Sequence, residues 1–173
     1  MKPKVSALSL LVLVGMGILA GGPSTRSAPL SSEEDGRFLL KAAELSRQGE
    51  LEANAVSGST RRAEIHATAQ SIADDYARAT RQLTDLAKGK EVELLASPPN
   101  QRNAVRFQTG SDSDRIAGLI KAHENAVALF HQEAVRGIDP ELKRFAETMV
   151  PALQRRLVEL RALQDRYPPS LSG

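Results

Sequence analysis

The chain contains no cysteine, so its three histidines are the residues best suited to bind a metal ion or to transfer a proton. The lack of cysteine excludes disulfide bonds, thiolate metal sites and cysteine nucleophiles. An imidazole beside carboxylates would suit iron, manganese or zinc. His123 lies between Ile120 and Val127 in an apolar pattern of helical spacing, so its side chain should point into a protein core. His66 and His131 lie off such patterns, and we expect them on the surface.

A metal centre in a helical bundle would need a second ligand close to each histidine. Di-metal sites of such bundles use a Glu-x-x-His pattern, in which a glutamate precedes the histidine by about one helical turn. The residues at that position here are Ala63, Ile120 and Ala128. The sequence therefore predicts no metal site and no cofactor, with His123 as the one candidate metal ligand. Otherwise His123 should be a buried side chain hydrogen-bonded to a neighbouring helix.

No pattern typical of an enzyme active site occurs in the sequence. A nucleophile elbow, a phosphate-binding loop and an HExxH helix are absent, and the His123-Glu124 pair lacks the second histidine of the last motif. We interpret four acidic residues of the helical segments as parts of solvated helix faces: Asp74, Asp75, Glu124 and Glu133. We therefore expect no catalytic residue and a protein that is not an enzyme.

Arginines gather toward the end of the last helical segment, at Arg155, Arg156, Arg161 and Arg166. Positive charges near the C-terminus of a helix offset its dipole, so a solvated face is the simplest interpretation. The alternative is a surface that contacts an anionic lipid or polymer, formed by Arg155, Arg161 and Arg166. Arg156 lies at the edge of the apolar stripe, from where it could reach inward to a carboxylate of the bundle.

Apolar residues at steps of three and four predict four amphipathic helices, near residues 33–57, 61–88, 111–136 and 140–167. Ser111 and Asp139 are expected to cap the last two helices, and Ser59 or Thr60 the second. The inward faces should carry Leu39, Ala42, Ser46, Gly49, Ala53 and Val56; Ile65, Ala69, Ile72, Tyr76, Ala79, Leu83 and Leu86; Ile116, Ile120, His123, Val127, Phe130 and Ala134; and Leu142, Phe145, Met149, Leu153, Leu157 and Leu160.

The segment between the second and third helices, residues 89–112, breaks this pattern and includes Pro98 and Pro99. A short helix is expected within it, near residues 101–108. Such a long connection is typical of a bundle in which one link spans the bundle's length. Strand patterns are nearly absent. The sequence therefore predicts an all-α four-helix bundle over residues 33–167, followed by a C-terminal tail over 168–173.

The first 20 residues have the parts of a secretory signal peptide, because Lys2 and Lys4 precede an apolar run of about 16 residues. As a helix this run would be roughly 24 Å long, shorter than the ~30 Å core of a membrane. We predict cleavage after residue 20, or as late as residue 28, a disordered tether over 21–32, and export to the periplasm or cell envelope. If the leader is uncleaved, it would be the protein's contact with the membrane.

The charge of the chain is nearly balanced once this leader is set aside. The full sequence has 23 lysines and arginines against 21 acidic residues, and the leader holds two of the lysines. Basic and acidic residues are then equal in number. This balance excludes a strongly basic body that binds nucleic acid.

Several short stretches occur in an order that resembles a known family. They are residues 38–43, 74–76, 121–130, 133–134, 139–143, 145–146 and 150–153, together with Gly137. The chain is similar over about residues 35–165 to the ferritin-like domain-of-unknown-function family of exported bacterial proteins, often labelled outer-membrane proteins. The resemblance is most specific in the last two helices, and it implies a fold and an envelope location rather than an activity.

The resemblance also implies where a ligand set would lie. Members commonly carry a glutamate in the first helix, Asp-His pairs in the second and third helices and a histidine in the fourth, which could converge in the core. The corresponding positions here are Gly49, Tyr76, His123 and Arg156, and His123 follows Ala122 instead of an aspartate. One of the implied histidines is therefore present.

Two functions of different classes are compatible with these features. The favoured one is an exported cell-envelope bundle with a non-catalytic binding or structural role, whose partner is an unidentified envelope protein or surface. The alternative is a ferritin-like metal-binding or redox protein with a site around His123. That site would draw carboxylates from Glu50, Glu52 or Asp75.

Overall fold

The computed structural model of this protein describes residues 33–94 and 107–168. Four long helices account for most of them: α1 (Glu33–Ser59), α2 (Ala63–Gly89), α4 (Asp112–Arg136) and α5 (Pro140–Arg166). The described residues contain no strand, and none of their helices is long and apolar enough to cross a membrane. The predicted leader, tether and most of the tail, and residues 95–106 of the predicted connection, lie outside the described residues.

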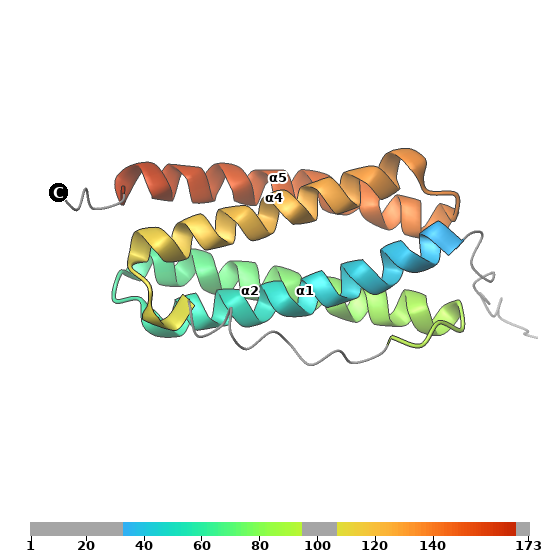
Figure 1. Cartoon of the computed structure of the whole chain (residues 1–173), viewed down its shortest axis with the longest axis horizontal. Coiled ribbons are helices and arrows are strands. Elements are labelled where there is room, and N and C mark those ends of the chain that lie inside the picture. Colours follow the sequence, from blue (N-terminus) through green and yellow to red (C-terminus); the bar gives the residue numbers. More distant parts are fainter. Residues whose placement is uncertain (1–32, 95–106, 169–173) are drawn as a thin grey trace, which may run out of the picture.

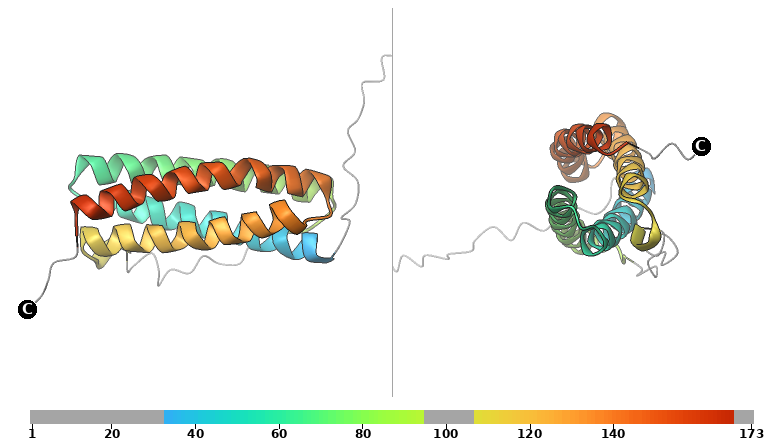
Figure 2. Two further views of the ribbon diagram at one scale, coloured as in Figure 1. Left: turned by 90° about the horizontal axis from the view of Figure 1, so that it is seen from above. Right: turned by 90° about the vertical axis from the view of Figure 1, so that its left-hand side faces the viewer.

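The helices form two antiparallel pairs, α1 with α2 and α4 with α5, which pack side by side into a bundle (Figures 1 and 2). At one end of the bundle, Lys90 after α2 contacts Asp139 at the start of α5, with Nζ to Oδ2 at 2.7 Å. At the other end, Arg62 before α2 contacts Asp112 at the start of α4, with Nε to Oδ2 at 3.1 Å. The connection from α2 to α4 therefore spans the length of α2, roughly 40 Å. This confirms the long connection predicted from the sequence.

Two of the three predicted helix caps are present. The Ser111 hydroxyl accepts the backbone N–H of Asp114, whose side chain accepts the N–H of Ser111 in return. Asp139 accepts the backbone N–H groups of Glu141 and Leu142, with Pro140 in the first turn. Both arrangements satisfy N–H groups that lack a partner within the helix.

The predicted cap of α2 is wrong. Ser59 belongs to the last turn of α1, where its hydroxyl donates to the carbonyl of Ala55 at 2.7 Å. Thr60 accepts only the N–H of Arg62, and Arg62 itself is at the N-cap position without a side-chain bond to the helix. Most of the short helix expected near residues 101–108 lies outside the described residues. Residues 107–109, which the structure describes, are helical.

Most residues of the predicted inward faces are buried, and the core is alanine-rich where α1 meets α2. Leu86 of α2 and Phe145 and Met149 of α5, also predicted to face inward, are only half-buried. Small residues let these two helices approach so closely that the Tyr76 ring lies against the backbone of Gly49. Toward the other end of α1, the Phe130 ring packs edge-on against Phe38 of α1 and Phe145 of α5, with ring centroids 5.5 and 5.8 Å apart. The Phe130 ring thus joins α1, α4 and α5 in one aromatic cluster.

The buried face of α4 differs from its predicted stripe. Val127 and Ala134 are only half-buried, whereas Leu119, Ala126 and Glu133 are buried. On this side α4 packs against α1, whose Phe38 lies on Phe130. Burial of Glu133 corrects the expectation that it belongs to a solvated face.

The close approach of α1 to Tyr76 predicts that Gly49→Ala destabilises the protein. An added Cβ would lie 2.5 Å from Cε2 of the buried Tyr76 ring, and overpacking of this kind costs about 1–3 kcal/mol. Chemical denaturation followed by circular dichroism measures the loss. Gly58→Ala is the matched control, because a Cβ there meets nothing within 4 Å and alanine favours a helix by about 0.5–1 kcal/mol. Equal stability of the two variants would contradict the close contact.

Candidate functional site

His123 lies in the centre of the bundle with only 1% of its surface exposed, as its place in the apolar stripe predicted. Its Nδ1 lies 2.9 Å from the carbonyl oxygen of Leu119 one turn earlier. The expectation of a bond to a neighbouring helix is therefore wrong, because the backbone of α4 itself accepts the proton. Burial lowers the pKa of His123, and the charge of Arg156 lowers it further, against the opposing effects of the Leu119 bond and Asp75. His123 is thus a neutral imidazole at neutral pH.

Tyr76 of α2 lies beside His123, with ring centroids 5.2 Å apart and ring planes inclined by 57°. Its hydroxyl is buried and has no hydrogen-bond partner. Burial raises the pKa of this hydroxyl above its usual value of 10.0, and the negative charges of Glu52 and Asp75 add to the effect. Tyr76 is therefore also neutral, and its ring fills the space that the absent side chain of Gly49 leaves.

Arg156 of α5 reaches inward to Asp75 of α2, as its place at the stripe edge suggested. Its Nε donates to Asp75 Oδ2 at 2.7 Å and Nη1 to Glu159 at 2.7 Å, while Nη2 donates to the Ser71 hydroxyl. Asp75 also pairs with Arg78. Asp75 is therefore a half-buried partner of two arginines, which corrects its interpretation as a solvated residue.

The four positions that the family resemblance singled out do meet in space. Tyr76 contacts Gly49 and His123, and Arg156 reaches Asp75, the residue next to Tyr76. These side chains do not fit a metal centre, however. Glycine offers no ligand, arginine brings a positive charge, and Asp75 is already occupied by two guanidinium groups. Among the residues described by the structure, no group of three or more His, Cys, Asp or Glu could hold a metal ion.

The arginines proposed as a contact surface are spread over the outer side of α5. Arg155 is exposed. Arg161 pairs with Glu124 of α4 at 3.3 Å, and Arg166 pairs with Glu64 of α2. Two of the three therefore also join helices within the bundle.

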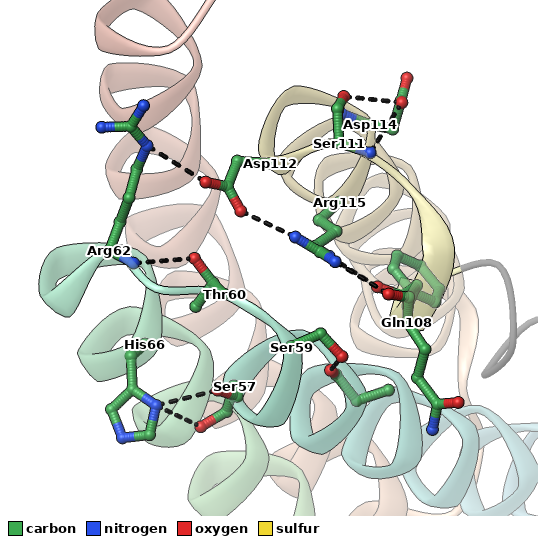
Figure 3. A network of polar contacts seen from close by, with 12 residues as sticks. Ser57, Ser59, Thr60, Arg62, His66, Gln108, Ser111, Asp112, Asp114 and Arg115 are labelled. Carbon is green, nitrogen blue, oxygen red and sulfur yellow. Dashed lines mark hydrogen bonds and ion pairs between the residues drawn. The ribbon is translucent and has the colours of Figure 1, made fainter.

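The bundle end that holds the α1–α2 turn carries a network of polar contacts (Figure 3). Arg62 and Arg115 both bind Asp112, which ties the start of α2 to the start of α4. His66 is exposed as predicted, but its Nδ1 lies 2.9 Å from the carbonyl oxygen of Ser57. His131 is exposed. The contacts of His66 and the arginines thus fasten helix ends.

The opposite bundle end buries charged groups that sequence reasoning missed. Burial works against the charge of Lys90, but hydrogen bonds to Asp139 and Glu141 outweigh it and raise the pKa of Lys90. Asp35 and Glu133 are buried close by. A signal for Glu133 was present in the sequence, because it follows Phe130 by three residues and so shares its helix face.

Comparison with known proteins gives one family. A family model described as a domain of unknown function, DUF4142, matches residues 20–163. No curated protein and no solved structure matches the chain.

The contacts of Arg156 predict that Arg156→Met lowers the free energy of unfolding by about 1–2 kcal/mol, because it breaks a partly buried charge pair and leaves Asp75 with one arginine. The exposed neighbour is the control, and Arg155→Met should change stability by less than about 0.5 kcal/mol. Urea denaturation of both variants measures the difference. In a double-mutant cycle with Asp75→Asn, a coupling energy near zero would show that the pair does not stabilise the bundle.

Proposed function

Since the chain belongs to the DUF4142 family of domains of unknown function, we propose that it is an exported cell-envelope protein whose helical bundle binds a partner and does not catalyse a reaction. The proposal joins three elements that are argued separately below. They are export through the N-terminal leader, a binding face on α5, and a ferritin-like arrangement of helices without the metal site of such folds.

Export is supported by the pattern of the first 20 residues, with two lysines before an apolar run. The family match begins at residue 20, where the leader is predicted to end. The matched span therefore begins where the exported chain would begin. The envelope is the proposed destination.

The observation that carries the binding role is the exposed side of α5. Val158 is 68% exposed, and Arg155 and Arg161 flank it at one helical turn on either side. An exposed apolar side chain between two arginines suits a partner that offers negative charge around a small apolar contact. We propose an acidic protein of the envelope as this partner, and an anionic lipid surface is the other outcome that the test distinguishes.

The arrangement of the helices supports a ferritin-like fold as part of this proposal, because two antiparallel pairs are joined by one connection along the bundle. Gly49, Tyr76, His123 and Arg156 lie close together in the core. This supports the view that they occupy the place where ferritin-like bundles hold their metal ions. The side chains at that position favour internal packing and charge pairing. A metal-binding or redox role is therefore the second candidate, and the residues present speak against it.

The binding face predicts that combined replacement of Arg155, Arg161 and Arg166 by alanine reduces retention in the envelope fraction at low salt, about tenfold if ~1.4 kcal/mol of binding is lost. Cell fractionation and immunoblotting measure retention. Arg144→Ala is the control, because Arg144 is exposed on the other half of α5. A circular dichroism melt must accompany the triple variant, since Arg161 and Arg166 also pair with Glu124 and Glu64.

Unchanged retention of a folded triple variant would exclude this face, and full-length protein in the cytosol with Met1 in place would exclude export. Co-sedimentation with vesicles of anionic phospholipid separates the two kinds of partner. Binding to vesicles that the triple variant loses would identify a lipid surface. No sedimentation, together with retention that a protease treatment of the envelope abolishes, would support a protein partner.

The side chains around His123 predict that protein purified without chelator contains no stoichiometric iron, manganese or zinc. Elemental analysis of the wild type and of His123→Ala tests this. A stoichiometric metal that disappears in the variant would establish the ferritin-like metal-binding role and contradict our interpretation of the core.

A further inference from the structure

The first turn of α1 is attached to the turn between α4 and α5 by one carboxylate. Asp35 accepts the backbone N–H of Ile138 at 3.0 Å through Oδ1 and that of Asp139 at 3.2 Å through Oδ2. Asp35 is 1% exposed, so it is held there away from water. Two backbone donors on its two oxygens favour the ionised form of Asp35.

Glu133 lies beside Asp35 in the last turn of α4, and it is 6% exposed. Its Oε1 is buried and has no hydrogen-bond partner. Three features of the place disfavour a second negative charge. The side chain is buried, the carboxyl group of Asp35 lines the same cavity, and the C-terminal end of a helix carries a partial negative charge.

Other charged groups surround Glu133 without neutralising it. The ion pairs found among the described residues include none with Glu133, and Arg37 is engaged with Glu33 and Glu34. A cavity of about 190 Å³ borders the site and gives it access to protons from water. The charged residues that face Glu133 are Glu34, Asp35, Arg37 and Lys41 from α1, Arg136 from α4, and Asp139 at the start of α5.

A hydrogen bond between two carboxyl groups requires a proton. Because both oxygens of Asp35 already accept N–H groups, Glu133 is the group suited to hold the proton and to donate it to Asp35. Burial, followed by the charge and hydrogen bond of Asp35 and the charges of Asp139 and Glu34, raises the pKa of Glu133 from 4.5 to about 7. The carboxyl group therefore changes its charge near neutral pH.

We propose that Asp35 and Glu133 form a proton-dependent latch, which holds the start of α1 to the α4–α5 turn while Glu133 is protonated and loosens when Glu133 loses its proton. Loss of the proton places two carboxylates side by side in a buried site. The repulsion is relieved when Asp35 moves away from the amides of Ile138 and Asp139. This device is independent of the proposed binding partner and of export.

The pH at which the latch loosens follows from the titration of Glu133. The folded protein binds the proton more tightly than the unfolded chain, so between about pH 4.5 and about pH 7 the folded state carries more protons. The contribution of Glu133 to stability is therefore complete at acidic pH and is lost as the pH rises through about 7. The attachment of α1 should be tight in mild acid and loose in mild base.

Hydrogen exchange of the Ile138 and Asp139 amides in the full chain tests the latch directly. After correction for intrinsic exchange, we expect their protection to fall at least about fivefold from about pH 5.5 to about pH 8.5, since one pKa unit corresponds to tenfold. Glu133→Gln keeps a neutral donor toward Asp35, so protection in this variant should change less than about twofold. Glu147→Gln, an exposed carboxyl on α5, should behave as the wild type does.

Equal protection of the wild type at both pH values would overturn the proposal. So would a fall in Glu133→Gln as large as that in the wild type. Carbon-13 NMR of the Glu133 carboxyl group gives a second readout that does not depend on motion of the turn. A midpoint near 7 supports the latch, whereas a midpoint near the ordinary 4.5 would show that the two carboxyl groups do not share a proton.

Discussion

Charged contacts between α2 and α5 join the two helix pairs of this bundle along its whole length. Lys90 pairs with Asp139 and Glu141 at one end, Asp75 with Arg156 in the middle, and Glu64 with Arg166 at the other end. The two helices are antiparallel, so the end of α2 lies beside the start of α5. The three contacts are therefore spaced along the bundle axis. These pairs hold α5 beside α2, and the polar contacts of Arg156 in the core depend on that arrangement.

The middle contact determines what the centre of the bundle can do. Arg156 brings a positive charge next to His123, which disfavours protonation of the imidazole, and it occupies the carboxylate of Asp75. Tyr76 adds a neutral ring that only a glycine at position 49 accommodates. A glycine, a tyrosine, a histidine and an arginine thus fit one another by volume and charge. Their side chains pack against one another, and the charge of Arg156 is paired with Asp75.

The two ends of the bundle use polar groups in different ways. At the end with the α1–α2 turn, exposed or half-exposed arginines bind carboxylates, and such pairs contribute about 0–1 kcal/mol each and weaken with salt. At the other end, Lys90, Asp35 and Glu133 are buried, where an unpaired charge is costly and a change of one proton has structural consequences. Sensitivity to pH is therefore expected to be local to this second end.

The sequence by itself determined the four helices, the inward direction of His123 and the long connection, because the period of apolar residues fixes which face of a helix is buried. It also indicated that Arg156 would reach inward. Only the tertiary structure decided that its partner is Asp75, and that Glu133 lies beside Asp35. Periodicity describes a helix relative to its own axis, whereas a partner 81 or 98 residues away depends on the rotation and register of separate helices, which packing alone sets.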